Sequence, residues 1–508
     1  MEHILTFLIA LLLASLGGLH ASEAPGTSGK PNVLIVLVDD MGYGDPGCFN
    51  PESRIATPHM DHLAREGMRF TDAHAGGSIC VPSRYSLLSG RMPYRTWKST
   101  SAQRIARNRR EMLHFRAPMI QFEAQRLNLA TLLKQQGYAT ACVGKWHQGM
   151  SSKAEADGRL KVTPVDFGFD YYFGFDAPEQ GPYAFIANKR FVVAPAETIK
   201  DHPGEGVTNS ETQGLHWRKG LAAPGWNFEG YLATLAGKAD DWLVQQAADG
   251  RGKPFFLYYA IPAPHAPWAA ASEFKGRSGA GPYGDYVMNV DAMIGQVMAT
   301  LQKLKLKENT LIIFSSDNGP VWYPQDIEKF GHRAAGLWKG MKGHLTEAGH
   351  HVPFIASWPG QIKAGSACGE LICFTDVMAT LASLLGERLP QNAGADSFDI
   401  SPLLRGEKPA SPIRTGMVHV NYGSYTVAVR AGDWKLILPE WLYSVKDGTI
   451  TPDHIVETPG KGPTEKFQLY NLRTDPGEAV NRFALEPDKA KELFAILQAD
   501  IARGRSRP

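Results

Sequence analysis

Cysteine is scarce in this chain. Five cysteines occur in 508 residues, at positions 48, 80, 142, 368 and 373, and no two of them have the CxxC spacing. This content excludes a disulfide-based scaffold and offers no CxxC zinc or redox pair. Whether Cys368 and Cys373 pair with each other stays open at this point.

An excess of charge of either sign is also missing. The 53 Lys and Arg residues nearly balance the 51 Asp and Glu residues, for a formal net charge of +2. No global positive field therefore exists to hold a polyanion, and we expect no nucleic-acid partner. The hydrophobic content of 43% and charged content of 20% are those of a globular protein. The length predicts several domains, or one large α/β domain with an appendage.

Beyond the N-terminus, no segment approaches 18 uninterrupted apolar residues, the length that a membrane-spanning helix needs. Residues 4–16 are almost entirely apolar but too few to span a bilayer. We interpret residues 1–21 as a signal peptide cleaved after Ala21, and residues 22–31 as a flexible leader. An uncleaved anchor or a buried helix is the alternative. We expect a secreted or periplasmic protein with no stable membrane insertion after cleavage.

Short apolar runs, each followed by a polar cluster, dominate the rest of the chain. They cover residues 33–38, 139–143, 255–259 and 311–314. Such runs are typical of strands buried on both faces, and helical patterns lie between them at 57–67, 127–137, 232–246 and 286–304. This alternation predicts an α/β fold in which ligands bind beyond the carboxyl ends of the strands, so the polar clusters should share one rim.

Two segments depart from this pattern. Residues 176–230 are rich in Gly, Pro and aromatic residues, and we interpret them as an insertion over the site. After residue 410, alternating patterns predict strands at 425–430, 434–438 and 467–471, and an amphipathic helix at 487–501. The predicted organisation is a main domain at 32–410 and a C-terminal α+β subdomain at 411–508.

The most informative stretch begins at Cys80, with the order Cys80-Val-Pro-Ser-Arg84 followed by Leu88-Ser-Gly-Arg91. Proline suits the first turn of a helix, so Cys80 is expected at a helix N-terminus, where backbone N–H groups favour a developing negative charge. Arg84, four residues on, can face the same site. A small buried hydrophobic cysteine is the alternative interpretation.

These residues resemble the Cys-x-Pro-Ser-Arg signature of the formylglycine-dependent, arylsulfatase-like sulfatases of the alkaline phosphatase superfamily. The resemblance extends over nearly the whole chain after residue 31. It implies a large mixed β-sheet flanked by helices on both faces, with a smaller C-terminal α+β subdomain. It also implies that a formylglycine-generating maturation enzyme oxidises Cys80 to Cα-formylglycine, whose hydrated aldehyde attacks sulfur. One hydroxyl of the gem-diol takes the sulfuryl group, and deprotonation of the other expels sulfate.

Oxygen donors follow two of the predicted strands. Asp39, Asp40, Asp317 and Asn318 form the hard ligand set that Ca²⁺ or Mg²⁺ prefers over zinc. Taken alone, an Asp-Asp pair after a strand is more often a loop or cap feature. The resemblance implies that these four residues and the modified residue 80 bind one Ca²⁺ ion.

Cationic residues complete the implied site. By the resemblance, Lys145, His265 and Lys342 clamp sulfate oxygens, Arg84 and His147 hold and deprotonate the diol, and His265 or Lys342 protonates the leaving oxygen. Near Lys342, the usual Glu-Gly-Gly-x-Arg-x-Pro motif has Ala348 and His351 in place of Gly and Arg. Adjacent histidines point in different directions, so we do not expect His350 and His351 to bind a second metal together.

The sequence thus predicts a sulfuric ester hydrolase acting on a sulfated carbohydrate or an aryl sulfate. One alternative is a phosphatase or phosphodiesterase of the same superfamily, which would need more His and Asp ligands for two zinc ions. Another is a non-catalytic glycan-binding protein, expected if Cys80 is not matured. A basic run (Arg104, Arg107, Arg109, Arg110 and Arg116) and several rim tryptophans (Trp146, Trp217, Trp226, Trp268 and Trp338) could contact a glycan. A solvated loop and buried core residues are the respective alternatives.

Overall fold

The structure is a computed structural model. It describes residues 29–96, 122–123, 125–151, 153–202, 214, 216–249, 252–421, 426–438, 444–446, 449–451 and 467–507. Residues Met1–Lys30 form one unit and Pro31–Pro508 another, and the description below concerns the second. The predicted signal peptide, most of the leader and the basic run at 104–116 lie outside the described residues. Among those described, no helix has the length and apolar character needed to cross a membrane.

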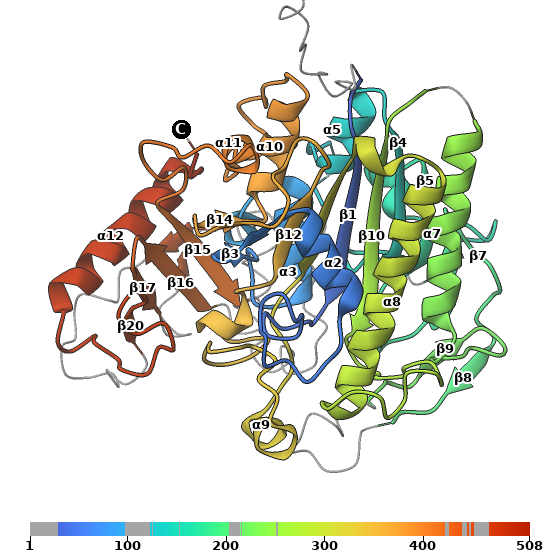
Figure 1. The fold of residues 1–508 in the computed structure, drawn as a ribbon, viewed down its shortest axis with the longest axis horizontal. Helices are drawn as coiled ribbons and strands as arrows, with labels where there is room; N and C mark the ends of the chain where they lie inside the picture. The colour runs from blue at the N-terminus through green and yellow to red at the C-terminus, as the bar shows by residue number, and fades with distance from the viewer. Residues whose placement is uncertain are drawn as a thin grey trace, which may run out of the picture. The chain divides into compact units, whose positions relative to one another are not determined.

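A ten-stranded mixed sheet forms the centre of this unit, in the order β13-β2-β12-β11-β1-β10-β4-β5-β6-β7 (Figure 1). Five neighbouring strands are parallel: β11 (Thr310–Ser316), β1 (Asn32–Asp39), β10 (Phe255–Pro264), β4 (Ala139–Lys145) and β5 (Tyr171–Phe175). The flanking strands are β13 (Ser366–Cys368), β2 (Met68–Phe70), β12 (Phe354–Ser357), β6 (Ile186–Ala187) and β7 (Arg190–Phe191). The α/β prediction is confirmed.

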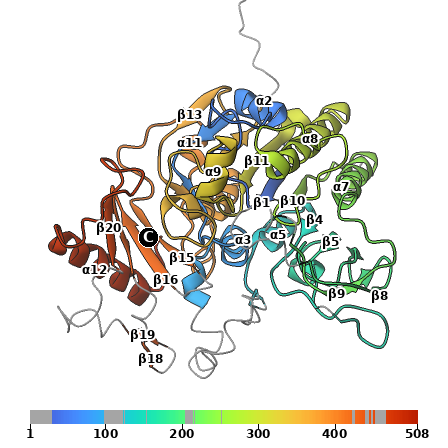
Figure 2. The ribbon, with the colours of Figure 1, turned by 90° about the horizontal axis from the view of Figure 1, so that it is seen from below.

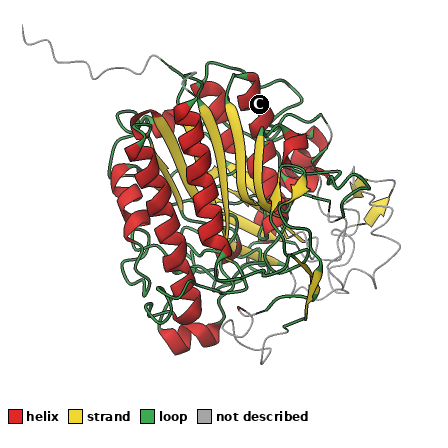
Figure 3. Ribbon diagram, turned by 90° about the vertical axis from the view of Figure 1, so that its right-hand side faces the viewer, coloured by secondary structure: helices red, strands yellow, loops and turns green. Residues whose placement is uncertain are grey.

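The apolar runs of the sequence fill two cores, one on each face of the sheet. In β1, Val33, Ile35 and Leu37 pack on one face, and the alternate residues Leu34 and Val36 pack on the other. Because both faces are buried, the strand must be apolar throughout, which explains its lack of alternation. Helices α2 (Pro58–Glu66), α7 (Tyr231–Ala248) and α8 (Gly281–Lys303) cover one face, and α3 (Cys80–Ser89), α5 (Leu129–Gln135), α10 (Asp376–Leu384) and α11 (Ser401–Leu404) the other (Figure 3).

A second, antiparallel sheet follows near the C-terminus. It has the order β15 (Gly416–Asn421), β16 (Thr426–Ala431), β17 (Trp434–Ile437) and β20 (Gln468–Asn471), and helix α12 (Pro487–Arg503) packs on β16 and β17 (Figure 2). The predicted strands and helix of this region match within one or two residues. Its apolar residues Val418, Val427 and Leu493 belong to the same core as one face of the large sheet.

Smaller elements connect these layers. They are β3 (Ala73–His74), β14 (Ile372–Cys373), β8 (Glu197–Ile199), β9 (Gly220–Ala222), β18 (Ser444–Lys446), β19 (Thr449–Thr451), α9 (Pro324–Phe330) and the 3-10 turns η1 (Pro93–Thr96), η2 (Pro164–Phe167), η3 (Lys307–Asn309) and η4 (Glu347–Gly349). Within the predicted insertion at 176–230, β6 and β7 extend the large sheet, whereas β8 and β9 pair with each other. The domain boundaries at 32–410 and 411–508 stay a prediction.

Candidate active site

The polar clusters that follow the parallel strands meet at one edge of the large sheet. Asp39 ends β1 and Lys145 ends β4, while Asp317 directly follows β11 and His265 directly follows β10. The pairing of β1 with β10 is irregular between Leu37 and Asp39, because β10 has additional residues there. Such a bulge re-aims the side chains at a strand end.

Four oxygen-donor residues from two of these strand ends are buried together. The backbone N–H of Asp40 donates to Asp317 Oδ1 over 3.2 Å, and Asn318 Nδ2 donates to Asp40 Oδ1 over 2.7 Å. Asp39 and Asp317 are fully buried, and Asn318 Oδ1 is buried without a hydrogen-bond partner among the described residues. Three carboxylates and an unsatisfied amide oxygen are costly to bury unless a cation binds them. This donor set fits Ca²⁺ or Mg²⁺.

Cys80 is the first residue of α3, and its side chain faces these carboxylates. Its Sγ lies 3.4 Å from Asp39 Oδ1, and one ligand atom each from Cys80, Asp39, Asp40 and His265 lies within 4.8 Å of the others. Burial and the Asp39 charge raise the pKa of this thiol far above its usual value. The thiol is therefore neutral at ordinary pH, and a neutral thiol is a weak nucleophile.

Each nearby cation binds one of the carboxylates. Lys145 Nζ lies 2.6 Å from Asp39 Oδ2, Arg84 Nε donates to Asp317 Oδ2 over 2.9 Å, and Lys342 Nζ lies 2.8 Å from Asp40 Oδ2. Burial opposes the charge on Lys145 and Lys342, but the neighbouring carboxylates outweigh it and raise both pKa values. Both amines therefore stay protonated at neutral pH.

The balance between burial and neighbouring charges shifts the pKa values of Asp39 and Asp317 in opposite directions. Burial would raise the pKa of Asp39, but Lys145, His265 and Arg84 outweigh it and hold the pKa well below its usual value. Burial and the charge on Asp39 instead raise the pKa of Asp317 to about 7. The two carboxylates thus differ in pKa although each is paired with a cation, because Asp317 also lies close to the charge on Asp39.

His147 lies beside this group in an unusual backbone conformation, with φ of 52°. Its backbone N–H donates to Asp176 Oδ1 over 3.1 Å. Its ring nitrogen Nδ1 is buried without a hydrogen-bond partner among the described residues. Burial and the charge on Lys145 lower its pKa well below the usual value, so the ring is neutral and can accept a proton.

One glycine makes this arrangement possible. Gly144 has φ of 115°, and a Cβ there would lie 1.9 Å from the carbonyl oxygen of Ala260 on β10. Only glycine allows β4 to approach β10 so closely just before Lys145.

His265 is nearly buried, and its Nε2 lies 3.7 Å from Asp40 Oδ2. Its Nδ1 lies 2.8 Å from the Ala266 carbonyl, which can only accept, so Nδ1 carries the proton of the neutral ring. Nε2 then faces the site and is free to exchange a proton there. The structure thus brings together all ten sequence-predicted site residues, which are Asp39, Asp40, Cys80, Arg84, Lys145, His147, His265, Asp317, Asn318 and Lys342.

The sequence interpretation missed two acidic residues near the site. Asp176 orients the backbone of His147, and burial raises its pKa to about 6. Burial acts to raise the pKa of Glu179, but the charges of His265 and Lys342 outweigh this effect, so the pKa is lowered. Both lie at the start of the predicted insertion, where no motif distinguishes them. Glu179 brings this segment within electrostatic reach of the site's cations.

The rim tryptophans divide into two groups. Trp146 is buried and stacks against Phe122 and Phe167, and Trp268 is also buried. Both are core residues, as the alternative interpretation holds, and are not available to stack on a sugar ring. Trp217, Trp226 and Trp338 are only partly buried.

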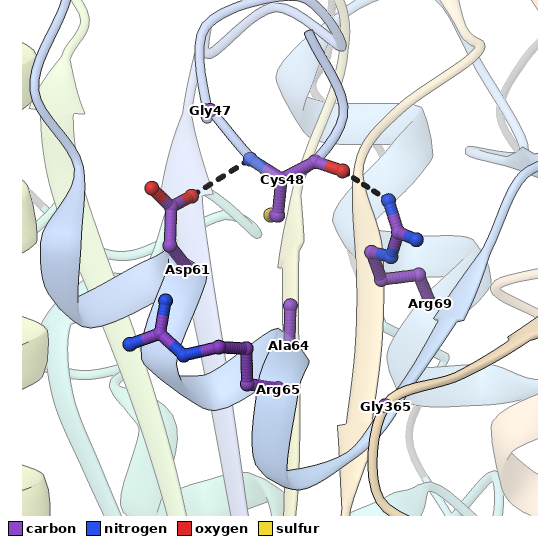
Figure 4. A pocket seen from close by; sticks show the side chains of 7 residues that line it. All are labelled: Gly47, Cys48, Asp61, Ala64, Arg65, Arg69 and Gly365. Atoms are coloured by element: carbon purple, nitrogen blue, oxygen red, sulfur yellow. Dashed lines mark hydrogen bonds between the residues drawn. The ribbon is translucent and has the colours of Figure 1, made fainter. Parts of the chain in front are cut away.

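A separate cavity of about 340 Å³ is lined by none of these site residues. Its lining is Gly47, Cys48, Asp61, Ala64, Arg65, Arg69 and Gly365, and Asp61 and Arg69 bind the backbone of Cys48 within it (Figure 4). All five cysteines, Cys368 and Cys373 included, have free thiols in the structure.

Comparison with known proteins gives one consistent result. The family model described as Sulfatase matches residues 31–387. An N-acetylgalactosamine-6-O-sulfatase of Bacteroides thetaiotaomicron is 32% identical, with 93% of each chain covered, and human arylsulfatase A is 33% identical, covering 93% of this chain and 86% of that protein. A solved 6S-sulfatase structure, described under glycosaminoglycan metabolism by B. thetaiotaomicron, has a TM-score of 0.74 at 30% identity, covering 93% of this chain and 99% of that one.

Proposed function

The chain belongs to the sulfatase family, and from this membership we propose a mechanism in which matured residue 80 attacks the sulfur of a sulfated carbohydrate. The enzyme class itself, hydrolysis of sulfate esters, follows from the family. The nucleophile, the metal ion and the substrate are the parts that we propose here.

The observation that carries the proposal is the convergence of Cys80, three carboxylates and the cations at one sheet edge. Cys80 faces Asp39, which also binds Lys145. A sulfate ester carries negative charge on its non-bridging oxygens, and the buried Lys145 and the partly buried Lys342 beside residue 80 provide complementary charge without reorganisation. A two-zinc phosphatase would need more histidine ligands than His265 supplies here.

In the proposed reaction, a maturation enzyme that supplies the oxidant first removes two electrons from Cβ of Cys80; the carbon–sulfur bond breaks, sulfur leaves as sulfide and water provides the oxygen of the aldehyde. The aldehyde then adds a second water to give a gem-diol. One diol oxygen forms a bond to sulfur, and the bond from sulfur to the ester oxygen breaks. The departing oxygen takes a proton and leaves as an alcohol. Deprotonation of the second hydroxyl re-forms the aldehyde, and the carbon–oxygen bond to sulfate breaks. Water then regenerates the diol.

The chain's own residues move the protons. His147 is neutral, with its Nδ1 unsatisfied, and can take a proton from a diol hydroxyl. His265 and Lys342 both lie against Asp40, and either can protonate the leaving oxygen, His265 through Nε2 once that nitrogen has taken up a proton. Arg84, fixed by Asp317, holds its charge beside residue 80 throughout.

We propose that Asp39, Asp40, Asp317 and Asn318 hold one Ca²⁺ ion. The unpartnered Asn318 Oδ1 and the gathering of three buried carboxylates around it support this assignment. When bound, the ion would polarise a sulfate oxygen and favour the ionised diol.

A sulfated carbohydrate is the proposed substrate class. Relatives that align with most of this chain are named N-acetylgalactosamine-6-sulfatases, so a 6-O-sulfated N-acetylgalactosamine is the first compound to test. We also propose an N-terminal signal peptide and an extracytoplasmic location for the mature enzyme.

Two measurements test the mechanism. Mass analysis of the peptide containing residue 80, from protein produced with a maturation enzyme, should show an aldehyde in place of the thiol. The matured enzyme in Ca²⁺ should hydrolyse an aryl sulfate faster than the matching aryl phosphate. Uniformly intact Cys80 in active protein, or faster phosphate turnover, would overturn the proposal.

Cys80→Ala should abolish turnover with cooperative unfolding retained, because it removes one small side chain at the rim. Intact Cys80 together with glycan binding and no turnover would favour the non-catalytic alternative.

A further inference from the structure

A second group of titratable residues lies outside the catalytic site, between the large sheet and the C-terminal sheet. His74 ends β3, His350 follows η4, and His419 lies on β15. All three rings are fully buried, and each offers a nitrogen within 4.8 Å of the others. We propose that these three histidines form a transition-metal site that takes Zn²⁺.

Hydrogen bonds on the far side of two rings fix their tautomers. His74 Nε2 lies 2.7 Å from Asp72 Oδ1, and an ionised carboxylate can only accept, so this nitrogen carries the proton. Arg430, 3.0 Å from the same nitrogen, has its own acceptor in Asp72 Oδ1 at 2.8 Å. His350 Nε2 lies 3.2 Å from the Leu345 carbonyl oxygen, which also can only accept.

The facing nitrogens are therefore both lone-pair donors. His74 Nδ1 and His350 Nδ1 lie only 3.0 Å apart. Two neutral imidazoles that donate Nε2–H outward would aim two lone pairs at each other, which requires a positive centre between them. A metal-ligating histidine commonly has this outer hydrogen bond to a carboxylate or carbonyl.

His419 supplies the third ligand. Neither of its ring nitrogens has a hydrogen-bond partner among the described residues, although the ring is fully buried. It stacks on His350 with ring centroids 3.7 Å apart and an interplanar angle of 17°. A buried imidazole without any partner is a costly arrangement that coordination of a metal would resolve.

The charges around the three rings do not oppose a cation. Three carboxylates and two cations lie around the rings. Arg430 binds Asp72, and Lys435 binds both Glu347 and Glu478. His351 lies between Glu347 Oε2 and the Thr71 carbonyl oxygen. The charged side chains around the triad therefore have no net positive charge. Three imidazoles favour Zn²⁺ over Ca²⁺, which prefers oxygen ligands.

The position of this site suggests what the metal does. His74 precedes Cys80 by six residues, and the N–H of Ala75 donates to the carbonyl of His350. The N–H of Ser78 donates to the Val420 carbonyl on β15, next to His419. A metal held by the three histidines would thus join β15 of the C-terminal sheet to the segment that leads into the α3 N-terminus. Since the ligands come from three distant parts of the chain, the metal binds only the folded state and stabilises it.

The experiment uses the full chain with Cys80→Ser, saturated with Ca²⁺, so that the catalytic site offers zinc neither a thiol nor free carboxylates. After dialysis against about 1 µM free Zn²⁺, elemental analysis should find one zinc per chain. X-ray absorption should show nitrogen ligands at about 2.0–2.1 Å and no sulfur. Zinc should also raise the unfolding midpoint by several degrees.

His419→Ala should lower zinc occupancy at least tenfold, whereas His351→Gln, a neighbouring buried histidine outside the triad, should retain it. Less than about 0.1 zinc per chain in the parent, or unchanged occupancy in His419→Ala, would overturn the proposal. Loss of zinc in His351→Gln alone would also overturn it, because Asp72, His74 and His351 would then be the site. If His419→Ala does not fold, the absorption spectrum of the parent decides, and carboxylate-only coordination there refutes the triad.

Discussion

Lys145 provides the sharpest test of the proposed site, through the substitution Lys145→Met, which keeps most of the side-chain volume and removes the charge. Its Nζ lies 2.6 Å from Asp39 Oδ2, and both side chains are fully buried. At an effective dielectric constant of about 20, this separation corresponds to a gross attraction of about 6 kcal/mol. Desolvation cancels part of it, so removing one partner should cost about 3–5 kcal/mol of stability in the absence of Ca²⁺.

The same substitution should slow catalysis. The loss of one preorganised charge at the sulfate should lower kcat/KM for an aryl sulfate by about 10²- to 10³-fold. The assay compares initial rates in saturating Ca²⁺, normalised to the fraction of chains with a matured residue 80, alongside thermal unfolding with and without Ca²⁺.

Lys275→Met is the matched control, because Lys275 pairs with Glu229 at the same 2.6 Å separation, but both side chains are about half exposed. Exposed pairs contribute less than about 1 kcal/mol, so this variant should keep both stability and rate. A Lys145→Met enzyme that retains more than a tenth of the parent kcat/KM would refute the role assigned to Lys145.

Three further predictions follow from the same contacts. If His265 protonates the leaving oxygen, His265→Asn should slow an alkyl or sugar sulfate far more than a nitrophenyl sulfate, whose leaving group needs no proton; equal losses on both substrates would contradict this role. Chelation of Ca²⁺ should lower both the rate and the unfolding midpoint, because an ion held by Asp39, Asp40, Asp317 and Asn318 binds only the folded state, and added Ca²⁺ should restore both; an unchanged chelated enzyme would argue against the ion. Burial raises the pKa of Asp176 to about 6, so the folded state binds more protons than the unfolded chain between about pH 4 and 6, and the stability from this group is lost as pH rises through 6. In Asp176→Asn, the free energy of unfolding should therefore fall less steeply between about pH 4 and 6, by at most about 3 kcal/mol in total. Denaturant unfolding at several pH values measures this difference.

Local sequence patterns determined the elements of this fold. The four apolar runs became β1, β4, β10 and β11, and the helix predicted at 57–67 became α2 at Pro58–Glu66. These predictions succeed because strands buried on both faces must be apolar throughout, and because prolines and glycines set helix ends over a few residues. The motif around Cys80 likewise identified the start of α3.

The sequence also indicated which polar residues share the sheet edge, since the carboxyl ends of parallel strands meet there. It could not give their pairing. Nothing local shows that Lys145 binds Asp39 while Lys342 binds Asp40, or that Asp317 has its pKa raised when that of Asp39 is lowered. Those differences depend on distances between segments up to 300 residues apart and on burial, which only packing establishes.

The histidine triad is the clearest case of what tertiary structure alone decided. By sequence, His350 and His351 are an adjacent pair that is not expected to bind one metal together, and His74 and His419 are isolated residues without a motif. In the fold, His350 and His351 do make different contacts, but His350 meets His74 and His419. The chain order carries no information about this meeting, because docking of β15 beside the segment before Cys80 creates it. Residue chemistry and strand periodicity are local properties of a sequence, whereas a buried cluster drawn from three segments arises only when the layers pack.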